Sequence, residues 1–497
     1  MISKKTIAIK FLLLLLLCVF ASGDAEVRCI EREREALLSF KNGLIDDDSS
    51  LSSWRRDECC EWHGVECSNT TGHVITLQCD NCGLQGEIGS SLLELHHLID
   101  LDLSMNDFGG IQIPGFIGSM KQLQHLFLSR SNFSGSIPPQ LGNLTNLRSL
   151  DLSYNPLSLI SPFIFGFVFG SLETMDLSYN QFTGLMPDLR AFPSLINLDL
   201  SGNNFTGSIP VSIGQLSKLQ VLDLSRNSLE GLVSESHFSK LHKLKTLDLS
   251  FNSLILDIAP DWSPPFQLNY IYLAGCSLGS FPKWIQTQMN LSHLDLRGAN
   301  ITDEAPRWLW NMPSSLHRLY LSDNQISGTV PNLSSTSIKL IDLSYNQFSG
   351  HIPPFPINAS IILLSGNMLS GAISSICKTR KASLNYLDLS NNQLEGEVPN
   401  CWEKMPKLYT LNLANNSFSG EIPLSLGDIR DLTILRMHGN HFSGELPNSL
   451  RFCQRLRFID VEGNKIPTWI GFVEINCMEV FLPRYAILLI FKFWICP

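Results

Sequence analysis

The chain has 497 residues, of which 44% are hydrophobic and 16% are charged. A chain that stays disordered has fewer apolar residues and more charge, so this composition predicts a folded protein. The formal net charge of −10 argues against general nucleic-acid binding, because that function needs a basic surface. Length alone would predict roughly three ordinary domains, but this estimate does not apply to a repeat array, which grows by stacking small units.

The N-terminus has the pattern of a secretory signal peptide over residues 1–23. Lysines precede an apolar core at residues 11–20, which is too short to span a bilayer. Ala21 and Gly23 are small residues placed for cleavage before Asp24. A short anchor helix is the alternative interpretation. Export makes disulfides plausible among the 13 cysteines.

Glycosylation sequons of the form N-x-[ST] recur along the chain. Each one alone is weak evidence, but on an exported chain the set predicts a heavily glycosylated surface. The sequon asparagines are Asn69, Asn132, Asn143, Asn204, Asn290, Asn300, Asn332, Asn358 and Asn415.

The strongest signal is a repeated segment. The stretches LRSLDLSYNPL, from Leu147, and LINLDLSGNNF, from Leu195, share the frame L-x-x-L-x-L-x-x-N-x-L/F. The frame recurs seventeen times at a mean spacing of about 24 residues, which lies in the range for leucine-rich repeats. We call the residue at the Asn position of each coil the ladder residue. The ladder residues are Cys82, Asn106, Ser131, Asn155, Asn180, Asn203, Asn227, Asn252, Cys276, Ala299, Asn324, Asn346, Asn367, Asn392, Asn416, Asn440 and Asn464.

Within each frame the apolar residues alternate as they do in a β-strand. Leu198 and Leu200 are expected to point inward and Asp199 outward. One such strand cannot bury its own apolar face, so successive coils must stack and share a core. The sequence therefore predicts an α/β solenoid of about 17 repeats, with a parallel β-sheet on a concave face that is open to solvent.

The ladder asparagines are expected to bond main-chain groups of their own and adjacent coils. Ala299 predicts a local weakness, because its side chain forms no hydrogen bond. Phenylalanines recur just after the ladder residue and predict a stacked aromatic spine. These are Phe133, Phe182, Phe205, Phe348, Phe418 and Phe442.

Residues 29–72 predict a cap over the apolar end of the solenoid. The stretch Glu31–Asn42 has helical apolar spacing. A Leu-Ser-Ser-Trp segment and a cysteine-rich segment follow it. By sequence alone, the four cysteines of this region permit three pairings. They are Cys29, Cys59, Cys60 and Cys67.

The remaining cysteines differ in how far their pairing can be predicted. Cys377 and Cys401 each lie seven residues before a strand leucine, so they occupy equivalent places in adjacent coils, about 5 Å apart, within disulfide reach. Cys79 and Cys82 form either a disulfide or two small core residues. No second Cys or His pair at ligand spacing follows them, so no metal site is predicted. Pairing stays open for Cys276, Cys453, Cys477 and Cys496.

Two motifs carry a resemblance to a known family. The S-G-x-I-P segments, as at Gly135–Pro138, resemble the plant-specific class of leucine-rich repeats. The segments CIEREREALLSFKNGL, from Cys29, and DECCEWHGVECSNTTGHVI, from Asp57, resemble the cap of plant leucine-rich-repeat receptor-like proteins, and are similar to those that perceive a fungal ethylene-inducing xylanase. The resemblance covers residues 1–464. It implies a right-handed superhelix with a second short strand in its coils, and the disulfides Cys29–Cys59 and Cys60–Cys67.

The same resemblance bears on the C-terminal end. Family members have no kinase domain, act through leucine-rich-repeat receptor kinase co-receptors, and typically carry a membrane helix after further repeats. Residues 467–497 resemble none of those parts, so we interpret the chain as C-terminally truncated. The predicted organisation is a signal peptide at 1–23, a cap at 24–72, leucine-rich repeats at 73–466 and a divergent apolar tail at 467–497.

The outward strand positions are where a ligand is expected. Aspartate is common there, either as repeat consensus on a solvated face or as an acidic track for a basic ligand. A cluster in three consecutive coils departs from this consensus and predicts a binding patch, because Tyr and Arg dominate binding hot spots. Ordinary surface variation is the alternative. We call this cluster the Tyr–His–Arg patch: Tyr270, Tyr272, His293, Arg297, His317, Arg318 and Tyr320.

The sequence contains no catalytic motif, so neither an enzyme nor a cofactor is predicted. We predict an extracellular ectodomain for plant immune perception, at the cell surface or secreted to the apoplast. Its expected partners are a protein or peptide ligand, such as a microbial elicitor, and co-receptor kinases if it is anchored. The alternatives are a secreted inhibitor of a pathogen cell-wall hydrolase, like polygalacturonase-inhibiting proteins, and a truncated gene product without a signalling role.

Overall fold

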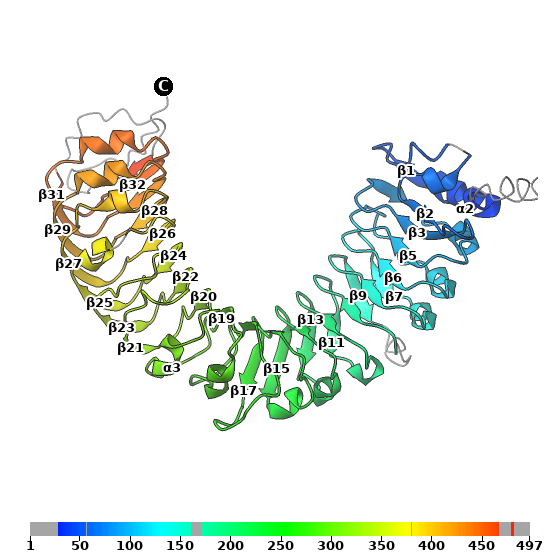
Figure 1. The fold of residues 1–497 in the computed structure, drawn as a ribbon, viewed down its shortest axis with the longest axis horizontal. Coiled ribbons are helices and arrows are strands. Elements are labelled where there is room, and N and C mark those ends of the chain that lie inside the picture. The colour runs from blue at the N-terminus through cyan, green and yellow to red at the C-terminus, as the bar shows by residue number, and fades with distance from the viewer. Residues whose placement is uncertain (1–27, 56, 161–169, 379, 467–478, 482–497) are drawn as a thin grey trace, which may run out of the picture. The chain divides into compact units, whose positions relative to one another are not determined.

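The structure is a computed structural model that describes residues 28–55, 57–160, 170–378, 380–466 and 479–481. It divides into two compact units, Met1–Phe182 and Thr183–Pro497. The predicted signal peptide lies outside the described residues, as do Cys477, Cys496 and most of the predicted tail. Each unit is a stack of coils, with one strand per coil in a main sheet (Figure 1).

The first unit begins with the predicted cap. Helix α2 spans Glu31–Asn42, as the apolar spacing predicts, and buries Leu37 and Phe40. The following aromatic residues seal the end of the core, since the rings of Trp54 and Trp62 stack at 5.3 Å. The other cap elements are β1 (Leu44–Asp46), which pairs antiparallel with β4 (Leu84–Gly86), η1 (Cys59–Glu61), and β2 (Val65–Cys67), which pairs antiparallel with β3 (Val74–Gln78).

The main sheet of the first unit continues in parallel from β3. Each strand is only three residues long, because the x-L-x pattern buries its central leucine and the chain then turns at the ladder residue. The strands are β5 (Asp100–Asp102), β6 (His125–Phe127), β8 (Ser149–Asp151) and β10 (Thr174–Asp176). Other segments of the coils are η2 (Ser90–Glu94), η3 (Gly115–Ser119), η4 (Pro139–Asn143) and a second sheet of β7 (Gly135–Ile137) and β9 (Leu157–Ile160).

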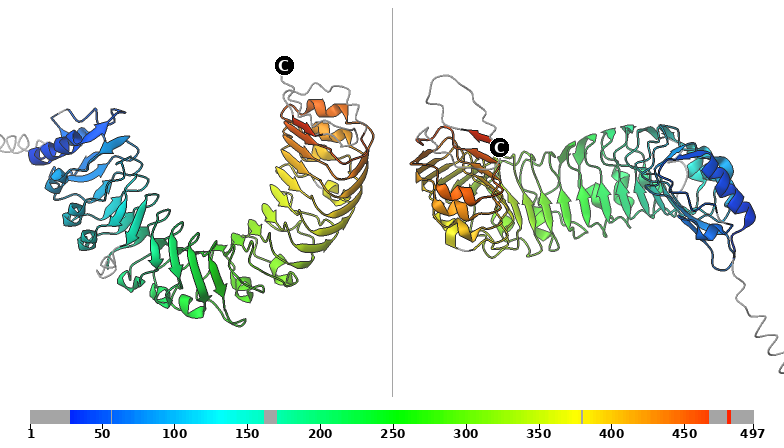
Figure 2. Two further views of the ribbon diagram at one scale, coloured as in Figure 1. Left: turned by 180° about the vertical axis from the view of Figure 1, so that it is seen from behind. Right: turned by 90° about the horizontal axis from the view of Figure 1, so that it is seen from above.

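The main sheet of the second unit has the same construction, and its strands lie side by side in both views of Figure 2. All of its pairings are parallel and in register, coil after coil. The strands are β12 (Asn197–Asp199), β14 (Val221–Asp223), β16 (Thr246–Asp248), β18 (Tyr270–Tyr272), β19 (His293–Asp295), β20 (Arg318–Tyr320), β22 (Leu340–Asp342), β24 (Ile361–Leu363), β26 (Tyr386–Asp388), β28 (Thr410–Asn412), β30 (Ile434–Arg436), β32 (Phe458–Asp460) and β33 (Glu479–Phe481).

Second strands follow the ladder residues of this unit, as the family resemblance implied. They form one group of β11 (Thr183–Leu185), β13 (Asn204–Gly207), β15 (Ser228–Val233) and β17 (Ser253–Leu256). They form another of β21 (Ser327–Thr329), β23 (Gln347–Gly350), β25 (Met368–Gly371), β27 (Gln393–Glu397), β29 (Ser417–Glu421) and β31 (His441–Ser443). The helical segments are η6 (Leu189–Ala191), η7 (Val211–Gln215), η8 (Glu235–Phe238), η9 (Lys283–Thr287), α3 (Arg307–Trp310), η10 (Ser374–Lys378), η11 (Trp402–Lys404), η12 (Leu424–Asp428) and η13 (Asn448–Phe452).

The ladder residues connect adjacent coils. The Asn106 carboxamide accepts a hydrogen bond from the Leu84 amide at 2.9 Å and donates to the Cys79 carbonyl at 2.8 Å. The exceptions reproduce part of this pattern. The Ser131 hydroxyl donates to the Leu103 carbonyl at 2.8 Å, and the Cys276 thiol donates to the Leu249 carbonyl at 3.3 Å. Serine and cysteine therefore keep the bond to the preceding coil.

The structure limits the weakness predicted at Ala299. The Leu278 amide, whose equivalents in most coils donate to a ladder carboxamide, donates to the main-chain oxygen of Ala299 at 3.0 Å. The Phe108 amide likewise donates to the Ser131 oxygen at 3.1 Å. In the coils of Ser131 and Ala299, a bond to a main-chain carbonyl therefore replaces the bond that a ladder asparagine side chain would accept.

The predicted stacking of phenylalanines is confirmed for part of the set, and leucines interrupt it in several coils. Phe108 and Phe133 stack at 5.0 Å, and Phe418 and Phe442 stack at 6.2 Å. Aliphatic residues fill the same buried place in several coils between them, namely Leu157, Leu229, Leu254, Leu369 and Leu394. The position requires a buried apolar side chain of suitable volume, and leucine meets that requirement without a ring.

Four disulfides are present in the described residues. Cys29–Cys59 and Cys60–Cys67 close the cap with the pairing that the resemblance implied. Cys377–Cys401 joins adjacent coils with a Cα–Cα distance of 5.8 Å, close to the spacing predicted from the repeat. The open choice at Cys79 and Cys82 resolves to a disulfide. Cys276 and Cys453 are unpaired and buried.

Candidate ligand-binding surface

Each strand of the main sheet presents two residues on its outward face. The second is usually aspartate, and its carboxylate accepts a hydrogen bond of 2.9–3.1 Å from the main-chain amide two residues later. This bond fixes the turn that leads out of the strand, so the acidic row has a structural role in every coil that carries it. The aspartates are Asp102, Asp151, Asp176, Asp199, Asp223, Asp248, Asp295, Asp342, Asp388 and Asp460.

The Tyr–His–Arg patch lies on β18, β19 and β20, where Tyr272 and Tyr320 replace the aspartate on β18 and β20 and Asp295 keeps it on β19. Tyr270 pairs in register with His293, which pairs with Arg318, and Tyr272 is aligned through Asp295 with Tyr320. The ring centroids of Tyr270 and His293 lie 4.9 Å apart, and those of Tyr270 and Tyr272 lie 6.5 Å apart. The structure thus brings the aromatic members of the predicted patch together on one surface.

Arg297 is held in place by the one aspartate within the patch. Its Nε lies 2.9 Å from Oδ1 of Asp295, and its terminal nitrogen lies 2.6 Å from Oδ2. The Asp295 hydrogen bond raises the pKa of Arg297 against the opposing effect of burial. The Arg297 guanidinium carbon also lies 4.9 Å from the Tyr320 ring centroid. Arg297 therefore contacts both Asp295 and Tyr320. Asp295, which sets the orientation of the guanidinium, is a buried residue with 4% exposure.

The two histidines of the patch differ in their surroundings. Burial, followed by the charges of Arg318 and His317, lowers the pKa of His293, so the ring is neutral at pH 7. The Nδ1 of His317 lies at hydrogen-bond distance from the Ser315 carbonyl, which holds its ring beside the turn before β20. His293 is therefore a contact residue of the sheet face, whereas His317 lies at the margin of the patch.

A second group of exposed side chains lies in the first unit and was missed by the sequence analysis. The residue before the ladder position has a positive φ in every coil, a conformation that favours glycine or asparagine. Arg130, Tyr154 and Tyr179 nevertheless occupy it in consecutive coils. The Arg130 guanidinium carbon lies 3.7 Å from the Tyr154 ring centroid, and the two tyrosines stack at 4.4 Å. The signal in the sequence that could have predicted this group is the run of bulky residues directly before the ladder residue in consecutive coils.

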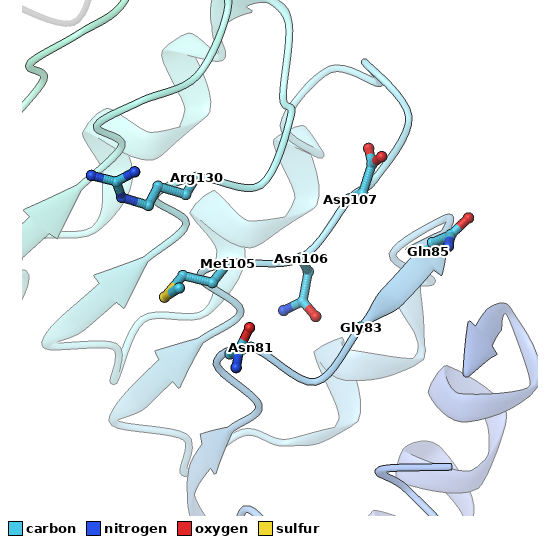
Figure 3. Close-up of a pocket in the computed structure, with 7 residues that line it drawn as sticks. All are labelled: Asn81, Gly83, Gln85, Met105, Asn106, Asp107 and Arg130. Atoms are coloured by element: carbon cyan, nitrogen blue, oxygen red, sulfur yellow. The ribbon is translucent and has the colours of Figure 1, made fainter. Parts of the chain in front are cut away.

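Figure 3 shows a shallow cavity beside this group, in which the Arg130 and Met105 side chains extend along one side. Its volume is about 340 Å³. The lining residues are Asn81, Gly83, Gln85, Met105, Asn106, Asp107 and Arg130. It lies in the first unit and contains no residue of the Tyr–His–Arg patch.

Groups that could hold a metal ion are scarce in the residues that the structure describes. The one cluster with suitable spacing is Cys29, Cys59 and Cys60. All three sulfurs are used in disulfides, so they offer no thiolate ligand. In the same described ranges, no helix is both long enough and apolar enough to cross a bilayer.

All nine sequon asparagines are exposed in the structure. None of them lies in a described strand of the main sheet, whereas Asn204 begins a second strand. The outward face of the main sheet is therefore free of potential glycan attachment along the strands that carry the patch.

Family models match the architecture seen in the structure. A model described as a leucine rich repeat N-terminal domain matches residues 30–68. Leucine rich repeat models match residues 145–205, 170–229 and 193–254. Further repeats are matched at 122–144, 287–305, 315–336, 337–359, 383–405, 407–429 and 431–453. These matches and the stacked coils define a capped leucine-rich-repeat ectodomain.

Comparison with individual proteins narrows this class. The chain is 34% identical to Receptor-like protein EIX2 of Solanum lycopersicum over 80% of this chain and 63% of that protein. It is also 34% identical to Receptor-like protein EIX1 of the same plant, over 70% of this chain and 57% of that one. The chain thus belongs to the plant leucine-rich-repeat receptor-like proteins. It spans about three fifths of the length of these relatives.

Solved ectodomains share the fold. The ectodomain of the Arabidopsis thaliana receptor kinase GASSHO1/SCHENGEN3, in complex with CASPARIAN STRIP INTEGRITY FACTOR 2, has a TM-score of 0.78 and 30% identity. The match covers 91% of this chain and 55% of that one. The ectodomain of the Arabidopsis receptor kinase HAESA, in complex with an IDA peptide hormone ligand, has a TM-score of 0.62 and 26% identity, over 91% and 85% of the two chains.

Proposed function

We propose that this chain is an extracellular ligand-recognition ectodomain that binds a protein or peptide through the Tyr–His–Arg patch. One observation carries the proposal. Tyrosine, a residue type that dominates binding hot spots, takes the place of the row aspartate on β18 and β20, and ring contacts join Tyr270 to His293 and Tyr320 to Arg297. Preformed contacts reduce the entropy lost when these side chains bind a partner.

The surroundings of the patch support the same role. The outward face carries no sequon asparagine on the described main-sheet strands, so no glycan is expected on the strands that carry the patch. Two solved ectodomains of the same fold are described in complex with CASPARIAN STRIP INTEGRITY FACTOR 2 and with a peptide hormone ligand. We extend ligand binding, but neither of those ligands, to this chain.

The finer parts of the proposal follow from the family. We place the chain in the secretory pathway and at the cell surface or in the apoplast, with a signal peptide at residues 1–23 and a cap at 24–72. The recognition region is the repeat array at residues 73–466, and residues 467–497 are a divergent tail. We propose a role in plant immune perception of a microbial protein, with receptor kinases as signalling partners where the protein is anchored.

The test measures binding to a fungal ethylene-inducing xylanase, the ligand type to which the family resemblance points. We expect Tyr272→Ala and Tyr320→Ala each to weaken the affinity by about tenfold or more, because each removes a central aromatic contact. Tyr386→Ala is the matched control, since Tyr386 occupies an outward position of β26, outside the patch.

Two results would count against this assignment of the surface. One is unchanged affinity in both patch variants, and the other is an equal loss in the Tyr386 control. Thermal unfolding of each variant shows whether the fold is retained, because both tyrosines are partly exposed and their removal creates no buried cavity.

A further inference from the structure

Arg318 is the uncommitted charge of the Tyr–His–Arg patch. Its side chain is exposed and makes no ion pair, hydrogen bond or ring contact within the part of the chain that the structure describes. Other arginines have carboxylate partners, such as Arg297 with Asp295 at 2.6 Å and Arg148 with Glu173 at 3.2 Å. A guanidinium left unpaired on a largely acidic face is available to a partner.

The aspartates on the two strands beside β20 already have hydrogen-bond partners. Asp295 is bound through both oxygens to Arg297. On the next strand, Asp342 accepts hydrogen bonds from the amide and the hydroxyl of Ser344 at 3.1 and 2.7 Å. Both carboxylates therefore have donors other than Arg318, and neither forms an ion pair with it.

Over five successive strands, Arg318 is the one charged residue at the first outward position. Successive strands place Tyr270, His293, Arg318, Leu340 and Ile361 in register at this position. Neighbouring strands are about 4.8 Å apart. One ligand side chain can therefore reach Arg318 while an adjacent one contacts a tyrosine or an aliphatic residue at the same position of another strand.

We infer that the Tyr–His–Arg patch recognises a ligand segment that carries a carboxylate side chain beside an aromatic or aliphatic one. Arg318 binds the carboxylate through its planar fork, which matches two oxygens at once. Tyr270 and Tyr272 contact the neighbouring apolar side chain. This inference rests on the proposed function and deepens it, because it names the chemistry of the ligand.

A peptide carboxylate fits this site better than a phosphate or sulfate group. Arg297 is already paired with Asp295 and His293 is neutral, so a single uncommitted cation faces the ligand. A dianion would meet the surrounding row of aspartates with little compensation. The same reasoning excludes a basic segment at Arg318, because two positive groups would repel.

The test uses the full secreted chain to select binders from a random peptide library, in parallel with Arg318→Gln. Arg307→Gln is the matched control, because Arg307 is an exposed arginine on helix α3, which precedes β20 in the chain and lies outside the patch. We expect the wild-type chain and the control to enrich Asp or Glu next to Phe, Tyr, Trp or Leu, and Arg318→Gln to lose that preference. A selected peptide should bind Arg318→Gln about tenfold or more weakly, and Arg318→Lys with an intermediate loss.

Several results would overturn the inference. The first is an equal content of acidic residues in the peptides selected by the wild-type and Arg318→Gln chains. The second is enrichment of basic peptides, and the third is selection of no peptide. The fourth is displacement of the selected peptide by inorganic phosphate at low concentration. The two proposals fail separately. Peptides without acidic residues whose binding needs Tyr272 and Tyr320 would leave the proposed function intact and refute only the carboxylate preference.

Discussion

Asn155 offers the sharpest test of how the coils are held together. It is 3% exposed. Its Oδ1 accepts hydrogen bonds from the amides of Ser131 and Phe133 at 3.2 and 2.9 Å. Its Nδ2 donates to the Leu128 carbonyl of the preceding coil at 2.9 Å and to the Leu152 carbonyl of its own coil at 3.0 Å. Nδ2 also donates to the Ser153 carbonyl at 3.1 Å. Asn155→Ala removes all five bonds and leaves buried main-chain groups behind.

The cost can be worked out from the groups left without their side-chain partner. These are two amides and the Leu128 carbonyl, because the Leu152 and Ser153 carbonyls keep bonds from the Asn180 carboxamide and the Arg130 amide. Each unsatisfied buried group costs about 1 kcal/mol or more. We expect the free energy of unfolding to fall by about 3 kcal/mol. Asn155→Ser should lose about half as much, because Ser131 shows that a ladder hydroxyl still donates one coil back, to Leu103 at 2.8 Å.

Urea unfolding of the full chain, combined with hydrogen exchange over residues 128–133, measures both the size and the place of the effect. The second measurement matters because a stack of coils can open locally. Asn146→Ala is the control, since this exposed carboxamide also donates one coil back, to Lys121 at 2.9 Å, and its loss should cost under about 0.5 kcal/mol. A loss for Asn155→Ala no larger than that of the control would refute the reasoning.

Three further outcomes are expected. Burial raises the pKa of Cys276 to about 12, so iodoacetamide at pH 8 should label this thiol only after unfolding. A mass increase at Cys276 in the native chain would contradict this prediction. Cys377→Ser should lower stability by about 3 kcal/mol in thermal unfolding, with no further loss on adding Cys401→Ser, and additive losses would argue against a shared bond. The Arg190 hydrogen bond holds the pKa of Asp188 at about 2, so the stability that this bond contributes should be present above pH about 4 and be lost as pH falls toward about 2. An NMR titration midpoint of Asp188 near the ordinary value of about 4 would disprove this prediction.

The patch shows how far prediction from sequence could go. The register of β18, β19 and β20 follows from counting residues between leucines, because every coil contributes one strand in the same phase. The sequence therefore predicted that Tyr270, His293 and Arg318 would be neighbours. It could not predict that Arg297 turns back to Asp295 while Arg318 stays unpaired, since that choice depends on which carboxylate lies within about 3 Å of each guanidinium.

The sequence by itself determined the coil period, the inward leucines, the cap helix at Glu31–Asn42 and the Cys377–Cys401 pair. In a solenoid, contacts join residues one period apart, so linear spacing converts directly into neighbourhood. Only the tertiary structure decided the structural role of the aspartate row, the leucines that interrupt the phenylalanine stack and the positive φ under Tyr154. Those features depend on the backbone direction at each turn and on competition between nearby partners, and neither is encoded in a repeat spacing.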